Sequence, residues 1–109
     1  HLFESLRSAV IALQHDRELI EIAGPRTITY YDPDFFLEII PRQHRLDLLL
    51  SIDFADIDDP FTLAEDMETR SFLLHATQHG GVVLYMNEPH ELNQMIPLIR
   101  QSLNAARSN

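Results

Sequence analysis

The stretch from Thr27 to Ile52 constrains the fold of this 109-residue chain more than any other. It holds three short segments rich in β-branched, aromatic and leucine residues, and turn-forming clusters separate them. The segments are 27–31, 35–40 and 45–52, and the turns are Asp32-Pro33-Asp34 and Pro41-Arg42-Gln43-His44. This alternation is typical of an antiparallel meander. The stretch therefore predicts three consecutive strands, with Pro41 at a strand end or an edge because it lacks a backbone N–H.

The rest of the chain predicts three helices and two more strands. Apolar residues spaced by three and four indicate a helix from Leu2 to about Asp16, and another that begins at the cap Asn87. Strands are expected at 18–23, with a continued helix as the alternative there, and at 82–86. A further helix is predicted over Pro60–Glu68, with Asp58 or Asp59 as its cap. It would bury four apolar side chains: Phe61, Leu63, Ala64 and Met67.

The predicted order of elements is α-β-β-β-β-α-β-α, in a single α+β domain over residues 1–109. Each helix carries one apolar stripe, and the strands need cover on at least one face. We therefore expect a mostly antiparallel, twisted sheet of about 4–5 strands with helices packed on it. We leave open that the chain is a fragment of a longer protein.

The composition narrows the classes of partner. The net charge is −9, and every basic residue is an arginine. Such a chain repels phosphate backbones unless its arginines cluster, and Arg26, Arg42 and Arg45 offer only a small basic spot. We therefore do not expect nucleic acid as a partner.

The absence of cysteine and the lack of long apolar runs bear on disulfides, metal sites and membrane segments. The chain has no cysteine, which excludes disulfides and thiolate metal sites. No apolar run is long enough to span a bilayer, and a signal-peptide pattern is missing from the start. A cytoplasmic location is our default expectation.

Two histidines form a candidate metal site. On a helix, the side chains of His75 and His79 would point the same way, as a zinc or nickel pair requires. A third ligand is not set by the sequence, although His90, Asp66 or Glu68 could approach. We prefer two solvated histidines in a loop before Gly80, and we expect no cofactor.

Carboxylates also fall within the predicted strands. Glu38 and Asp47 would form an acid–base pair or hold magnesium if they shared a face. Nuclease sites of that kind also use a lysine, and this chain has none. We interpret both residues as the water-facing members of half-buried strands.

The aromatic pairs of the meander suggest a contact surface. Successive strand residues point to opposite faces, so one member of Tyr30-Tyr31 and one of Phe35-Phe36 joins the core. The other members would lie on an exposed surface that marks a binding or dimer interface. The residues assigned to this interface are Tyr30, Phe36, Arg42 and Arg45.

The order of several motifs resembles a known family. These are Ile28-Thr29-Tyr30-Tyr31, Pro41-Arg42-Gln43-His44-Arg45-Leu46, Asp59-Pro60 and Leu98-Ile99-Arg100-Gln101. Together they resemble an uncharacterised bacterial domain family labelled "predicted transport protein". Its members commonly form a small C-terminal module, sometimes attached to nuclease-like domains. The resemblance covers nearly the whole chain and implies no established activity.

This chain departs from the family's pattern at two places. Members typically carry a lysine before the first meander strand and a Gly-His-Trp-Gly-like segment before the last strand. Here Pro25-Arg26 and the segment Leu74 to Gly80 stand in those places. A site that the family shares at these positions would therefore be lost in this chain.

The leading hypothesis is a non-enzymatic interaction or dimerisation module that acts by self-association or by docking onto a larger bacterial protein. One alternative is a metal-dependent hydrolase or nuclease accessory domain that uses His75 and His79. A second alternative is a small-ligand-binding domain, with a pocket between the sheet and a last helix kinked at Pro97.

Overall fold

The computed structural model describes residues 2–13, 19–32, 34–67 and 81–107, and its sheet has six strands rather than four or five. The strand order is β1-β2-β3-β4-β6-β5, and all neighbours are antiparallel, so the predicted α+β class and mostly antiparallel sheet are confirmed. The strands are β1 Ile20–Ala23, β2 Ile28–Tyr31, β3 Phe35–Pro41, β4 Leu46–Leu50, β5 Glu65–Asp66 and β6 Val82–Met86.

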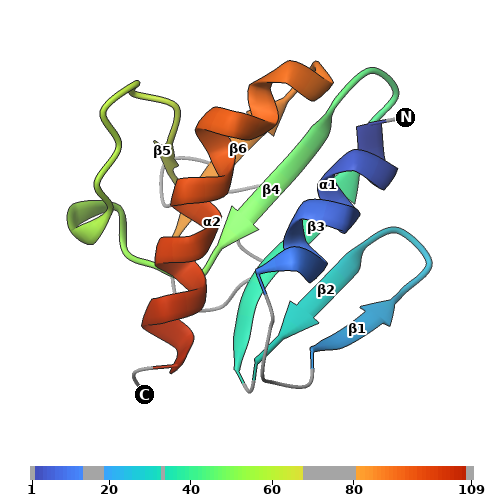
Figure 1. Ribbon diagram of the computed structural model, residues 1–109, viewed down its shortest axis with the longest axis horizontal. Helices are drawn as coiled ribbons and strands as arrows, with labels where there is room; N and C mark the ends of the chain where they lie inside the picture. Colours follow the sequence, from blue (N-terminus) through green and yellow to red (C-terminus); the bar gives the residue numbers. More distant parts are fainter. Residues whose placement is uncertain (1, 14–18, 33, 68–80, 108–109) are drawn as a thin grey trace.

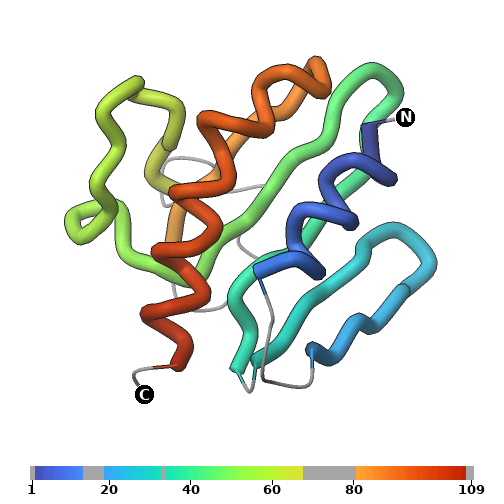
Figure 2. The backbone as a smooth tube through the Cα atoms, in the orientation of Figure 1, coloured from blue at the N-terminus to red at the C-terminus, as the bar shows by residue number. Residues whose placement is uncertain are grey.

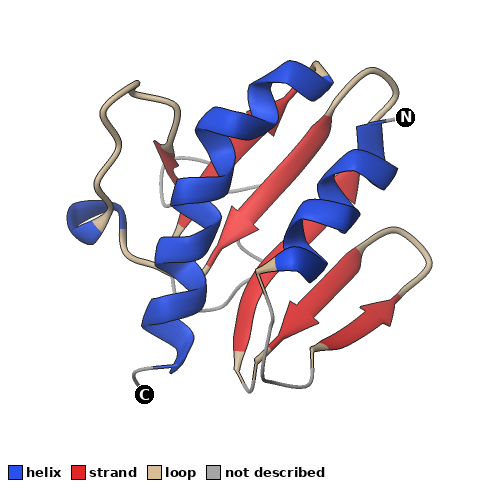
Figure 3. Cartoon of the chain, viewed as in Figure 1, coloured by secondary structure: helices blue, strands red, loops and turns tan. Residues whose placement is uncertain are grey.

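Two helices, α1 (Leu2–Ala12) and α2 (Leu92–Arg107), lie on the same side of the sheet (Figures 1 and 3). We call this side the helix face and the opposite side the far face. In the described ranges, no helix is both long enough and apolar enough to cross a membrane. The buried residues of α2 recur at spacings of three and four, as expected for one stripe packed on the sheet: Met95, Leu98, Ile99, Ser102, Leu103 and Ala106.

The main core lies between the helices and the helix face. It takes alternate residues of the central strands, for example Leu46, Leu48 and Leu50 of β4. A smaller buried cluster on the far face contains Ile40, Leu49, Met67 and Val83. The central strands are therefore buried on both faces, which explains why four of the five residues of β4 are leucines.

A β-bulge interrupts the pairing of β2 with β3. Tyr30 lies opposite Leu37 and Tyr31 lies opposite Phe35, so Phe36 has no direct partner on β2. The extra residue places the Phe36 side chain in the main core beside Tyr30, with 6.4 Å between their ring centroids.

Ser102 of α2 binds the backbone at this bulge. Its hydroxyl donates to the carbonyl of Phe36 at 2.6 Å and accepts from the backbone N–H of Ser51 at 3.0 Å. Because its single proton is used, the Ser51 hydroxyl must be the donor in the 3.1 Å contact between the two side chains. One buried serine thus connects α2 to β3 and to the residue that follows β4.

The helix predicted over Pro60–Glu68 is wrong in its described part, and Phe61 is 62% exposed. The Asp59 carboxylate accepts from the N–H groups of Leu63 and Ala64, at 3.0 and 2.7 Å, and so closes a loop instead of capping a helix. The following residues form β5, which pairs with β6. Pairing with a distant strand therefore outweighs the local capping pattern.

The connection from β4 to β5 lies beside α2, as the tube in Figure 2 shows. It contains one short 3-10 helix, η1 (Phe54–Asp56). The Gln101 side chain of α2 holds this connection through two hydrogen bonds to the backbone of Asp58, each 2.8 Å long. Another 3-10 turn, η4 (Pro89–Glu91), precedes α2 and carries a capping box between Glu88 and Glu91.

The sequence predicts that Pro97 kinks the last helix or splits it, and α2 continues through Pro97, so the helix is not split. Pro97 and Asn93 are both exposed, which lets water reach the Asn93 carbonyl that lacks its usual N–H donor.

Ser102→Ala should lower the free energy of unfolding by about 1–3 kcal/mol, because it leaves the buried Phe36 carbonyl without its donor. Ser51→Ala is the matched control, since it removes only the contact between the two hydroxyls. Urea denaturation measures both. Equal losses in the two variants would contradict the proposed role of Ser102.

Candidate functional site

The structure contradicts the prediction of which aromatic residues form the exposed interface. One member of each aromatic pair joins the core, as expected, but Tyr30 and Phe36 are the buried members, at 0% exposure. Their assignment to an exposed surface is therefore wrong. Tyr30 shares the helix face with Ile28, whereas the bulge moves Phe36 off the alternation that would place it on the far face.

Tyr31 and Phe35 are the partly exposed members, and β1 extends their surface. Their rings meet edge-on with 6.5 Å between centroids, and Ile20 lies opposite Tyr31 in the next strand. Ile20 and Ile22 are 46% and 52% exposed. We call Ile20, Ile22, Tyr31 and Phe35 the apolar strip of the far face.

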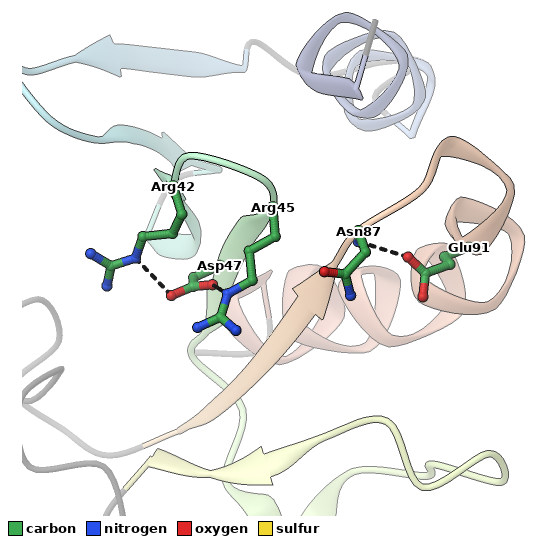
Figure 4. A network of polar contacts seen from close by, with 5 residues as sticks. All are labelled: Arg42, Arg45, Asp47, Asn87 and Glu91. Carbon is green, nitrogen blue, oxygen red and sulfur yellow. Dashed lines mark hydrogen bonds and ion pairs between the residues drawn. The ribbon is translucent and has the colours of Figure 1, made fainter.

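Arg42 and Arg45 meet at a buried carboxylate (Figure 4). Their Nε atoms donate to the two oxygens of Asp47, at 2.9 and 2.8 Å. The side chain of Asp47 is 1% exposed and those of the arginines 42% and 43%. Asp47 is therefore not the water-facing residue that we expected, and neither is Glu38 of β3, which is 7% exposed. Burial of the Asp47 charge requires these cations.

The surroundings of Asp47 hold the arginines in place. Asp47 lies in β4 between Ile40 of β3 and Tyr85 of β6. The guanidinium of Arg45 stacks over the ring of Tyr85, 4.4 Å from its centroid. A rigid strand thus fixes one nitrogen of each guanidinium. No other described residue accepts a hydrogen bond from the terminal nitrogens of Arg42 or Arg45.

Arg42 also borders a hollow at this end of the sheet. The hollow has a volume of about 480 Å³ and lies between the β1–β2 turn and the end of β3. Arg26 is exposed and forms no ion pair or hydrogen bond with another described residue. The predicted basic spot therefore exists at Arg26 and Arg42. The lining residues are Gly24, Pro25, Arg26, Thr27, Ile28, Ile40, Pro41 and Arg42.

A second titratable cluster connects α1 to the sheet. Arg7 donates to both carboxylate oxygens of Glu21, at 2.9 and 3.2 Å, and the Tyr30 hydroxyl donates to one of them at 2.5 Å. The hydrogen bond from Arg7, and to a smaller extent the one from Tyr30, lowers the pKa of Glu21. Burial, and then the bond to Glu21, raise the pKa of Tyr30. The cluster is a tether between α1, β1 and β2.

The predicted metal site cannot be placed, because His75 and His79 lie outside the described residues. Within the described ranges, no three histidine or carboxylate side chains are grouped so as to hold a metal ion. The hollow at the β1–β2 turn also differs in position from the ligand pocket expected between the sheet and the last helix.

Searches against protein-family models, curated proteins and solved structures find no match for the chain. The resemblance to the bacterial family labelled "predicted transport protein" therefore stays a hypothesis.

We expect Arg42 and Arg45 to stabilise Asp47 redundantly. Either Arg42→Ala or Arg45→Ala should cost below about 1 kcal/mol, because each side chain is partly exposed and the other cation remains. The double variant should cost more than the sum, by about 1–3 kcal/mol, because it leaves a buried carboxylate without a cation. Urea denaturation of the full cycle measures this excess.

An Asp47→Asn background provides the control for this cycle. There, removal of both arginines should add little further loss, because the charge that they neutralise is absent. If the losses of the two single arginine variants simply add up in the protein that keeps Asp47, the two arginines are not redundant.

Glu21 should make stability depend on pH. Its lowered folded pKa means that its contribution is complete above the unfolded pKa of about 4.3 and disappears as pH falls through the folded value. Glu21→Gln should therefore be less stable than wild type at about pH 6, with the gap closing toward about pH 3. Denaturant titrations across this range measure the gap. Glu4→Gln, which leaves the Arg7–Glu21–Tyr30 contacts intact, serves as control; a constant gap for Glu21→Gln would contradict the assignment.

Proposed function

We propose that the chain is a non-enzymatic cytoplasmic module that self-associates through β1 and the apolar strip. The observation that carries this proposal is the exposed edge of the sheet. β1 ends the strand order, all four of its residues are exposed, and none of the described strands lies beyond it. An exposed strand edge offers unpaired N–H and C=O groups to an added strand.

The side chains of β1 favour addition of an apolar strand. Ile20 and Ile22 both project on the far face, next to Tyr31. Glu21, the single charged residue of β1, is engaged on the helix face by Arg7 and Tyr30. Charged side chains commonly protect sheet edges from pairing, and this one is already neutralised.

A second copy of the chain fits this edge by symmetry. Antiparallel pairing about a two-fold axis can place Ile22 opposite Ile22 of the second copy. Glu21 then lies opposite Ala23, so the two carboxylates do not face each other. The pairing would join the two sheets into one continuous sheet.

Sedimentation velocity should show a reversible dimer at concentrations on the order of 10–100 µM. Added salt should strengthen it, because it screens the repulsion between two chains of net charge −9. The double variant Ile20→Thr/Ile22→Thr should be monomeric. Its folding stability should change by only about 1 kcal/mol or less, since threonine also suits strands.

Phe61→Ser is the matched control, because it removes a larger exposed apolar side chain outside the apolar strip. It should dimerise as wild type does. A wild-type chain that stays monomeric over this range would exclude self-association, and equal dissociation of the Phe61 variant would exclude β1 as its site.

A further inference from the structure

We propose that Arg26 and Arg42 form a binding site for a small phosphomonoester in the hollow at the β1–β2 turn. Both arginines line this hollow, and they come from strand ends that are distant in sequence. Guanidinium groups present planar, fixed donors that match phosphate oxygens, and their charge is permanent. The proposal concerns side chains other than those of the apolar strip.

The charge balance at this end of the sheet favours an anion. Arg42 and Arg45 share the carboxylate of Asp47, whereas the whole chain has a net charge of −9. Glu38 of β3, another acid on the far face, is buried and does not line the hollow. Two cations surround one buried carboxylate, and Arg26 adds a third charge that no described acid neutralises. Two guanidinium groups beside one hollow suit the negative charge of a phosphomonoester, which approaches two charges at neutral pH.

Neither Glu88 nor Glu91 lines the hollow. Glu91 is engaged by the backbone N–H groups of Asn87 and Glu88, each at 2.7 Å, and lies beside α2 (Figure 4). Glu91 lies on the Arg45 side of the cluster (Figure 4). Arg26 and Arg42 are therefore the residues that we assign to direct ligand contact, and Arg45 supports them by sharing Asp47.

Asp47 preorganises the site. It binds Arg42 through Nε, so the two terminal nitrogens of that guanidinium point away from the carboxylate (Figure 4). A side chain held in its bound orientation loses less conformational entropy on binding. Arg42 is thus a contact residue and Asp47 a positioning residue.

The size and lining of the hollow indicate more than a bare ion. Its volume of about 480 Å³ falls within the usual range of small-molecule sites. Pro25 and Pro41 line the hollow next to the arginines, and Ile28 and Ile40 complete its lining at the strand ends. A long polyanion would meet the negative charge of the whole chain, whereas a small ligand responds mainly to charges within about 10 Å.

Binding can be measured by titration of the isotope-labelled protein with phenyl phosphate, followed by NMR at constant ionic strength. We expect saturable shifts confined to residues 24–28 and 40–42, with a weaker response to inorganic phosphate. Arg26→Gln or Arg42→Gln should weaken the affinity for phenyl phosphate at least about tenfold. Arg42→Lys should recover only part of it, because lysine keeps the charge but loses the planar fork.

Arg100→Gln is the matched control, since it removes one exposed arginine of α2 and should leave binding unchanged. An equal loss of affinity in this variant would show that only the net charge of the protein matters, and it would contradict a site at Arg26 and Arg42. Binding of benzoate as tight as that of phenyl phosphate would overturn the assignment to phosphate. Shifts no larger than those from matched sodium chloride would overturn binding itself.

Discussion

The bulge at Phe36 is the constraint on which the arrangement of the two faces depends. Without it, strict alternation along β3 would place Phe35 with Leu37 and Ile39 on the helix face. The extra residue instead moves Phe36 into the core and leaves Phe35 beside Tyr31 on the far face. Ser102 of α2 satisfies the displaced carbonyl, so helix packing and bulge stabilise each other.

The sequence predicts elements well where the pattern is local. The meander, the strand at 82–86 and the two terminal helices follow from alternation, spacing and turn residues, and the structure confirms them. The predicted cap at Asn87 is wrong, because Glu88 caps a 3-10 turn and α2 begins at Leu92. The prediction failed over 60–67 because Asp59 and Pro60 imitate a helix start, while pairing between β5 and β6 depends on residues far along the chain. Non-local pairing of this kind leaves no local pattern.

The same distinction applies to the candidate site. The closeness of Arg42 and Arg45 follows from the turn between them. The choice of Tyr30 over Tyr31 as the exposed member was wrong, because alternation along β2 does not say which of its faces the helices cover. Three features depend on register between strands and were missed: the burial of Asp47, the stack on Tyr85 and the shared hollow of Arg26 and Arg42. An acid within an apolar leucine strand and two nearby arginines are the signal that could have indicated the pair.

The two proposed surfaces use different side chains but meet at the β1–β2 turn. Gly24 and Arg26 line the hollow, and Gly24 directly follows the strand that would pair with a second copy. In the register with Ile22 opposite Ile22, Gly24 lies opposite Ile20 of the second copy, so the turn borders both surfaces. Any effect of a bound anion on association must then be matched by an equal effect of association on anion affinity, because binding free energies are reciprocal. The rigid β1–β2 turn, closed by the 2.7 Å bond from Gly24 N–H to the Thr27 carbonyl, is the element through which such coupling would act.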